Sequence, residues 1–337
     1  MLVLTTACNL DCAYCYEGGT GRRGVAMDVA TAMKALEMVA SGNRPFHVQL
    51  TGGEPLLEAE LVLTILDRIR REGWSATTAL QTNGLLLNRD CARRLKSFGT
   101  AVGVSVDGLP GMQERLRGGS TETYRAMRVL DSEQVPFSVT TVLTSLNTAE
   151  LSGFAMALNS WPMASAIGLD LLVRKGSAVS GVTGMVPPDA VMLRQGITTL
   201  LEVLDFLNRH RRPPIVLREK QLLLGSLKRG VAAPYCQACT GSSIAVTPGG
   251  ELFPCTQTMG DRNFLLGTLD NPHLSDTVLL DRCLPECEAC LECDLRGRCP
   301  GDCPSRLHYN GKEGGDLVCA MYRAIYDYCI NKGEIPS

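Results

Sequence analysis

Short apolar runs alternate with segments of helical periodicity over the first half of the chain. Each run is rich in β-branched residues and is followed by a loop and then by a segment with the 3.6-residue period of a helix. The pattern predicts helices near 28–40, 57–72, 88–98, 121–132 and 148–158, between strands at Leu2–Thr6, Phe46–Leu50, Ala76–Gln81, Ala101–Val106, Phe137–Leu143 and Ile167–Val173. Because βα units with short connections form parallel sheets with right-handed crossovers, we expect an α/β fold. It should be a partial (β/α)6 barrel of the TIM type, with its site at the carboxyl ends of the strands.

The pattern changes in the second half of the chain. Residues 181–232 have helical periodicity on both sides of a Pro213-Pro214 break and are predicted to be bridging helices. Further along, eleven of the fifteen cysteines occur from Cys236 onward, among many Gly and Pro residues. Such a segment has too little apolar surface to fold alone and is expected to depend on bound metal. We therefore expect a barrel over 1–180, a bridge over 181–232 and a small cysteine-rich domain over 233–337.

Composition narrows the class of protein and its partners. The chain has 337 residues, 45% of them hydrophobic and 20% charged, with a net charge of −2, so nothing favours nucleic acid as a partner. The apolar runs are shorter than the roughly 20 residues that span a bilayer, and Met1 leads directly into the first strand rather than into a secretory signal. We expect a cytoplasmic protein without a membrane partner, whose many cysteines bind metal rather than form disulfides.

The first strand is followed by three closely spaced cysteines. Cys8, Cys12 and Cys15 have C-x3-C-x2-C spacing on a loop at the predicted mouth of the barrel. Three thiolates on one loop can ligate three irons of a [4Fe–4S] cluster and leave the fourth iron open to a substrate or cofactor. A zinc-binding loop is the alternative.

With Tyr14 before its last cysteine, this motif resembles the signature of the radical S-adenosylmethionine (SAM) superfamily. The resemblance implies that the open iron binds the amino and carboxylate groups of SAM. It further implies that an electron delivered to the cluster cleaves SAM, and that the resulting 5′-deoxyadenosyl radical abstracts a hydrogen atom from the substrate.

Polar residues at the ends of later strands resemble further motifs of the superfamily. Thr51 is followed by a GGEP sequence that, by resemblance, holds the SAM amino group; its residues are Gly52, Gly53, Glu54 and Pro55. The spacing of Ser105 and Asp107 resembles the peptide-modifying branch, which implies a SAM and substrate pocket and makes Asp107 a candidate catalytic residue. Arg174, at the end of the sixth strand, is a candidate for the polar end of the cofactor, with an ordinary surface arginine as the alternative.

The C-terminal cysteines resemble the SPASM extension of radical SAM enzymes that mature peptides and proteins. Ile244–Phe253 is predicted to form a β-hairpin that delivers one of these cysteines. The resemblance implies two auxiliary [4Fe–4S] clusters, and therefore three clusters in total. One would be held by Cys236, Cys239, Cys255 and Cys303, and the other by Cys290, Cys293, Cys299 and Cys319. Two structural zinc sites are the rival interpretation.

Four cysteines lie outside these sets. Cys91 and Cys329 are in helical segments and are predicted to be buried apolar residues. Cys283 and Cys287 precede the second set and are predicted to be structural, with a register shift or hydrogen-atom donation as alternatives.

Two clusters with four thiolates each would offer no open iron and would carry electrons, which favours oxidative chemistry. We expect a thioether, a carbon–carbon crosslink or a similar bond in a ribosomally made peptide or protein, with flavodoxin or ferredoxin as electron donor. The chain begins at the first strand, so the substrate is expected to dock on the barrel or the extension or to arrive with a separate peptide-recognition protein. Alternatives are epimerisation, modification of a small molecule, and a non-catalytic zinc or iron–sulfur module.

Sulfatase maturation is a further alternative. In sulfatase maturases an Asp follows the hairpin cysteine and acts as the base, whereas this chain has Thr256 there. That departure counts against sulfatase maturation and leaves Asp107, Glu17 and Asp261 as candidate bases.

Overall fold

The computed structural model describes residues 1–18, 24–179, 184–232, 234–274 and 290–335. Its centre is a curved sheet, of which the described part has nine strands in the order β7-β6-β5-β4-β3-β2-β1-β8-β9. All neighbouring pairs are parallel except the β8–β9 hairpin. The strands are β1 (Leu2–Val3), β2 (Phe46–Thr51), β3 (Ala76–Thr82), β4 (Ala101–Ser105), β5 (Phe137–Leu143), β6 (Ala164–Leu171), β7 (Val216–Leu217), β8 (Ala245–Val246) and β9 (Leu252–Phe253).

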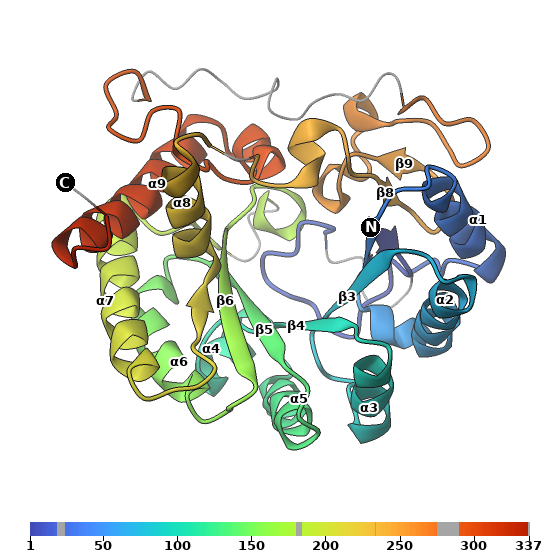
Figure 1. Ribbon diagram of the computed structural model, residues 1–337, viewed down its shortest axis with the longest axis horizontal. Coiled ribbons are helices and arrows are strands. Elements are labelled where there is room, and N and C mark those ends of the chain that lie inside the picture. Colours follow the sequence, from blue (N-terminus) through green and yellow to red (C-terminus); the bar gives the residue numbers. More distant parts are fainter. Residues whose placement is uncertain (19–23, 180–183, 233, 275–289, 336–337) are drawn as a thin grey trace.

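Helices cover the outer face of this sheet (Figure 1), as expected for a partial barrel of the TIM type. Those between the barrel strands are α1 (Val29–Ala40), α2 (Ala59–Glu72), α3 (Arg89–Ser97), α4 (Pro110–Leu116), α5 (Ser120–Ser132) and α6 (Leu151–Leu158). They are followed by α7 (Ala190–Asn208), α8 (Arg218–Arg229) and α9 (Pro304–Asn331). The predicted fold class is confirmed, and the short helix α4 is an addition to the predicted elements.

Two predicted strands have different ends, for identifiable reasons. The first strand ends at Val3. Beyond it, Leu4 N still donates to Thr51 O at 2.9 Å, while Leu4 O accepts from Met27 N and Thr5 forms an isolated antiparallel bridge with Ala26. The sixth strand begins at Ala164 and stops at Leu171. It stops there because the Asn310 side chain of α9 bonds the backbone beyond it, donating to Leu172 O at 2.7 Å and accepting from Arg174 N at 2.8 Å.

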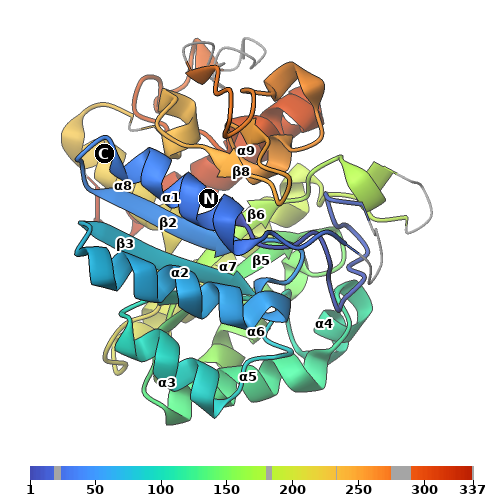
Figure 2. The same ribbon diagram turned by 90° about the vertical axis from the view of Figure 1, so that its right-hand side faces the viewer.

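The sheet extends past the barrel at both edges. β7, from the predicted bridging segment, pairs with β6, and β8, from the cysteine-rich segment, pairs with β1. The C-terminal segment then crosses one end of the barrel, as Figures 1 and 2 show. The predicted three-part division of the chain stays a prediction, and the sheet is continuous across both of its boundaries. No described helix has the length and apolar character that crossing a bilayer requires.

Alternation along the strands separates core from site. In β5, Phe137, Val139, Thr141 and Leu143 are buried on the side of the covering helices, while Ser138, Thr140 and Val142 alternate with them on the inner face of the barrel and are half-buried. One apolar core therefore supports the outside of the sheet, and its inner face is free to line a cavity.

Candidate active site

A cavity of about 600 Å³ lies at the carboxyl ends of the barrel strands. Its floor includes Gln49 of β2, Gln81 of β3, Ser105 of β4 and Thr140 of β5. These polar residues stand at inward-facing positions of the strands, where a half-buried polar side chain needs a partner or a ligand. Gln81 donates to the Ser105 hydroxyl at 2.9 Å. Ser105 thus lines the cavity, and its assignment to a SAM and substrate pocket stays a prediction. Gln49, which also lines the cavity, was not singled out from the sequence.

The cysteine loop after β1 forms one wall of the cavity. Cys8, Cys12 and Cys15 all line it. Backbone contacts hold the loop from two sides, since Ala13 N donates to Leu116 O at 2.9 Å and Ser177 N donates to Cys15 O at 2.9 Å. Burial is the largest effect on all three thiols and raises their pKa, that of Cys12 to about 12. Burial therefore favours the protonated thiols, and a bound metal would have to keep them deprotonated as thiolates.

The turn after β2 is pressed against the same loop. Gly53 N donates to Thr5 O at 2.8 Å, and Glu54 N donates to Ala7 O at 2.9 Å. A Cβ atom on Gly53 would lie 2.2 Å from Ala7 O. Gly52 has a φ of 154°, and a Cβ atom there would lie 2.5 Å from Thr5 O. The paired glycines are therefore required by a close approach of two backbones at the cavity.

Glu54 joins the ends of β2 and β3 from inside the protein. Its carboxylate accepts from Leu56 N at 3.0 Å, from the Thr82 hydroxyl at 2.7 Å and from Asn83 N at 2.8 Å. Burial outweighs these bonds and raises the pKa of Glu54 to about 6. The next residue, Pro55, is buried and begins a short 3-10 helix. Glu54 therefore shapes the turn with its side chain, which leaves the backbone of the turn to face a ligand.

Asp107 is placed differently from the sequence-based assignment. It is fully buried and is not among the described residues that line the cavity. Its carboxylate accepts from the Tyr14 hydroxyl, from Arg117 Nε at 2.8 Å and from Val142 N at 2.9 Å. Asp107 thus anchors the cysteine loop through Tyr14, which itself lines the cavity, and this geometry gives it a positioning role rather than that of a free base. Sequence reasoning missed Arg117, the cation that makes this burial tolerable.

Arg174 also points away from the cavity. Its guanidinium pairs with Glu313 of α9, and it is not one of the described cavity residues. Of the other candidate bases, Asp261 caps a short 3-10 helix and accepts from the Tyr309 hydroxyl at 3.1 Å, also outside the described cavity lining. Glu17 does line the cavity. Of the three candidate bases, Glu17 is the one that the structure places among the described residues lining the cavity.

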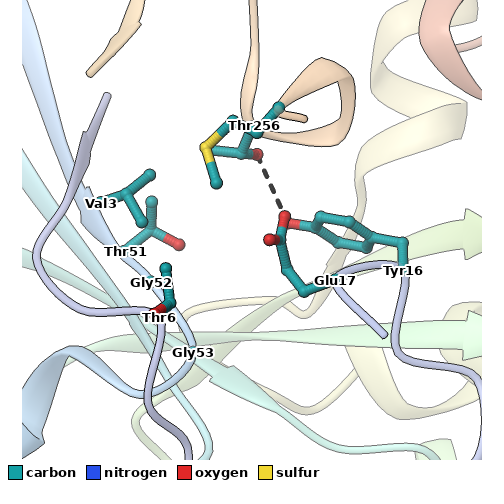
Figure 3. A pocket seen from close by; sticks show the side chains of 9 residues that line it. Val3, Thr6, Tyr16, Glu17, Thr51, Gly52, Gly53 and Thr256 are labelled. Atoms are coloured by element: carbon teal, nitrogen blue, oxygen red, sulfur yellow. Dashed lines mark hydrogen bonds between the residues drawn. The ribbon is translucent and has the colours of Figure 1, made fainter. Parts of the chain in front are cut away.

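Figure 3 shows a small pocket that adjoins this cavity and shares most of its lining residues, where the extension meets the barrel. Tyr16 and Glu17 follow Cys15 and lie opposite the Thr51–Gly53 turn, with Thr256 of the extension beside them. The Tyr16 hydroxyl donates to Thr256 Oγ1 at 3.4 Å. The residues that directly follow Cys15 and Cys255 therefore touch each other.

Four cysteines of the extension come together next to this junction. The Sγ atoms of Cys236 and Cys239 are 3.8 Å apart, and Cys303 interacts electrostatically with both Cys239 and Cys255. Their contact lowers the pKa of Cys239 to about 7 and, with burial, raises that of Cys236. Cys236 itself lines the cavity. Of the set that the SPASM resemblance assigns to one auxiliary cluster, Cys236 and Cys239 are thus in contact and Cys255 and Cys303 interact with their neighbours in it, and the assignment stays a prediction.

The other cysteines differ in their surroundings, and two of them are not described by the structure. Cys293 and Cys299 pack against the core beside α9, and Cys319 is on α9. Cys329 is fully buried, as predicted, and Cys91 is half-buried against the core. Cys283 and Cys287 lie outside the described residues.

The donor set fits iron–sulfur clusters in chemistry. Within the described ranges, no group of three or more His, Cys, Asp or Glu side chains is arranged to hold a metal ion. A cubane cluster distributes its thiolates over separate irons and needs them spread around a hollow. Three thiols spread along the wall of one cavity meet that requirement.

A partly buried ion network borders the cavity on the side of β6. Asp170 accepts from Arg218 of α8 at 2.8 Å and from Arg306 of α9 at 2.6 Å. Arg306 also pairs with Asp302 and donates to the Tyr235 hydroxyl at 2.8 Å. Burial alone would raise the pKa of Asp170, but the two guanidinium groups hold it well below its usual range. Sequence reasoning missed this network, because its members are far apart in the chain.

Comparison with known proteins identifies relatives of the chain. Residues 2–155 match the family model of the Radical SAM superfamily. An uncharacterized protein of Methanocaldococcus jannaschii is 28% identical over 271 residues, which are 77% of this chain and 85% of the relative. The serine-type anaerobic sulfatase-maturating enzyme of Klebsiella aerogenes is 24% identical over 346 residues, covering 94% of this chain and 81% of that enzyme.

Solved structures share the fold along almost the whole chain. The structure of anSMEcpe with bound AdoMet and the Kp18Cys peptide superposes with a TM-score of 0.81 at 19% identity, covering 98% of this chain and 97% of that one. Streptococcus suis SuiB bound to the precursor peptide SuiA superposes with a TM-score of 0.68 at 16% identity, covering 94% and 74%. Both likenesses show the architecture, including a C-terminal extension on a partial barrel.

Proposed function

This chain is a radical SAM enzyme, and we propose that it uses SAM-derived radical chemistry to modify a ribosomally made peptide or protein oxidatively. One observation carries the oxidative part of the proposal. The four cysteines assigned to an auxiliary cluster gather beside the same cavity that holds Cys8, Cys12 and Cys15. An electron acceptor at that position could take an electron from a substrate radical formed in the cavity.

Different residues of the chain would bind the cluster and SAM. Cys8, Cys12 and Cys15 would hold the [4Fe–4S] cluster, and the backbone of the Thr51–Pro55 turn would bind the amino group of SAM. When bound, cluster and SAM supply the 5′-deoxyadenosyl radical. Gln81 and Ser105 provide polar contacts on the cavity floor, where burial strengthens hydrogen bonds to a ligand.

A peptide substrate is supported by the relatives. The solved structures of anSMEcpe and SuiB contain a Kp18Cys peptide and the precursor peptide SuiA, respectively. Sulfatase maturation is not favoured, because Thr256 has no ionisable carboxyl group with which to act as a base. We further propose a cytoplasmic location, reduction by flavodoxin or ferredoxin, and a separate peptide-recognition protein as a partner.

The first test is the metal content of protein purified and reconstituted without oxygen. Three clusters predict about twelve irons and twelve acid-labile sulfides per chain, without zinc. About four irons with two zincs would contradict the electron-transfer role of the extension and favour a non-oxidative reaction such as epimerisation. Negligible iron with several zincs would contradict radical chemistry and favour a non-catalytic zinc module.

The second test distinguishes the cluster proposed for Cys8, Cys12 and Cys15 from the auxiliary clusters proposed for the C-terminal cysteines. Replacing Cys8, Cys12 and Cys15 together by Ala should abolish 5′-deoxyadenosine formation and remove about four irons. The matched control is Cys91→Ala, which should keep both. With a peptide substrate in hand, an oxidative product should have lost the mass of two hydrogens, whereas an epimerised product would have an unchanged mass.

A further inference from the structure

Glu17 is a carboxylate on the cavity wall for which the described structure provides no hydrogen-bond partner. It lies two residues after Cys15 and faces the cavity beside Thr256 (Figure 3). Its Oε1 atom is buried, and no donor among the described residues reaches it. An unpaired buried carboxylate oxygen is unfavourable, so a binding partner is expected.

The other charged groups on the cavity wall already have partners or are exposed. Glu54 accepts three hydrogen bonds, Arg117 pairs with Asp107, and Asp170 pairs with Arg218. A further carboxylate, Asp11, is exposed. Within the described lining, Glu17 is therefore the part-buried charge that is free to bind a ligand.

Lys175 interacts electrostatically with Glu17, but its ammonium group is hydrogen-bonded to other residues. Its ammonium donates to Gln257 O and Met259 O, each at 2.7 Å, and these carbonyls belong to the loop after Cys255. No ion pair within 4.0 Å joins Lys175 to Glu17 in the described part of the chain. Lys175 thus holds the extension in place and leaves the Glu17 carboxylate open.

We propose that Glu17 binds a cationic side chain, lysine or arginine, of the substrate peptide beside the residue that is modified. This inference rests on the proposed function, because it assumes that a peptide enters the cavity. A cation is favoured over a neutral donor because it both forms a charge-assisted hydrogen bond and neutralises a buried charge. The residue would therefore determine specificity without taking part in the bond-breaking steps.

The experiment is a selection for binding that does not depend on turnover. Reconstituted full-length enzyme with SAM is immobilised, and a display library of random peptides is selected on the wild type, Glu17→Gln and Glu17→Lys. Glu60→Gln, which alters an exposed carboxylate on α2, is the matched control. Iron content and circular dichroism confirm that each variant is folded and loaded.

Wild type and Glu60→Gln should enrich Lys and Arg at one position, Glu17→Gln should lose this enrichment, and Glu17→Lys should favour Asp or Glu there. For a selected peptide, Glu17→Gln should weaken binding about tenfold. The same enrichment in wild type and Glu17→Gln would overturn the proposal, as would no enrichment of Lys and Arg in the wild type.

The SAM ammonium is the other available cation, and a separate measurement distinguishes it. If Glu17→Gln weakens SAM binding and leaves peptide selection unchanged, Glu17 serves the cofactor and the proposal is wrong. Failure of the wild type to form 5′-deoxyadenosine would instead contradict the proposed function, whatever peptides it selects.

Discussion

At the scale of single residues, the site depends on a close approach that only glycine allows. Gly53 stands where the turn after β2 meets the cysteine loop, and its amide bonds Thr5 O at 2.8 Å. The contact fixes the distance between the cysteine loop and the turn proposed to bind SAM. It therefore couples the stability of the loop to its function.

Gly53→Ala should destabilise the protein and displace the cysteine loop. The new Cβ atom would lie 2.2 Å from Ala7 O, so one backbone must move. We expect a loss of roughly 1 to 3 kcal/mol in the free energy of unfolding, with weaker SAM binding. The control is Gly153→Ala in α6, where nothing lies within 4 Å and stability should rise by about 0.5 to 1 kcal/mol. Equal effects of the two substitutions would contradict this account.

Glu54 should make stability depend on pH in a definite direction. Its pKa is raised from 4.5 to about 6 in the folded protein, so folding favours the protonated form. Its contribution is fully present below pH 4.5 and is lost as the pH rises through about 6, a change of about 2 kcal/mol.

Urea unfolding of the wild type and Glu54→Gln over this interval measures the effect. The difference between the two free energies of unfolding should vary with pH by the stated amount and level off above it. Two parallel pH profiles would show that Glu54 does not titrate as inferred.

At the scale of elements, the hairpin β8–β9 and the loop after it connect the extension to the barrel. β8 pairs with β1, and Lys175, just beyond β6, donates to two carbonyls of that loop. These contacts place Cys255 and Thr256 over the cavity from opposite sides. Backbone pairing and one lysine therefore position Cys255, one of the four cysteines assigned to an auxiliary cluster.

Lys175→Met should loosen this loop while keeping the barrel intact. Each hydrogen bond from the ammonium contributes roughly 1.5 to 3 kcal/mol. Amide hydrogen exchange across 255–261 should accelerate about tenfold or more, with little change in β2 to β5. The control is the exposed Lys228→Met at the end of α8. Unchanged exchange across 255–261 would contradict the role given to Lys175.

At the scale of the whole molecule, one ion network joins barrel, bridge and extension. Asp170 belongs to β6, Arg218 to α8 and Arg306 to α9, three elements that come together on one side of the cavity. The carboxylate therefore holds together parts of the chain that are distant in sequence. Such a buried network specifies one arrangement of the parts rather than adding much net stability.

Arg306→Met should uncouple these parts, because it leaves the buried Asp302 and the half-buried Asp170 with fewer partners. We expect a loss of roughly 3 to 5 kcal/mol in the free energy of unfolding. Thermal unfolding should show an earlier transition of the extension. The control on the same helix is the exposed Arg323→Met, which should be close to neutral. A single unshifted transition in Arg306→Met would show that the network does not couple the parts.

Sequence alone determined the alternation of strands and helices and the cysteine motifs. The side-chain period is two residues in a strand and 3.6 residues in a helix, and both follow from the geometry of the backbone. The barrel was therefore predictable from the sequence, apart from the exact ends of its strands. Cys8, Cys12 and Cys15 share one short loop, and their chemistry needs no distant partner to be identified.

Only the tertiary structure decided the roles of side chains whose partners are remote. Asp107 and Arg174 lie just beyond the ends of β4 and β6, but Arg117 holds the first and Glu313 the second away from the cavity. Glu17, a candidate base by sequence, became a candidate for binding a substrate cation because folding buries one of its oxygens without a partner among the described residues. Local periodicity carries no information about such contacts, since burial and pairing depend on elements that the fold brings together from distant parts of the chain.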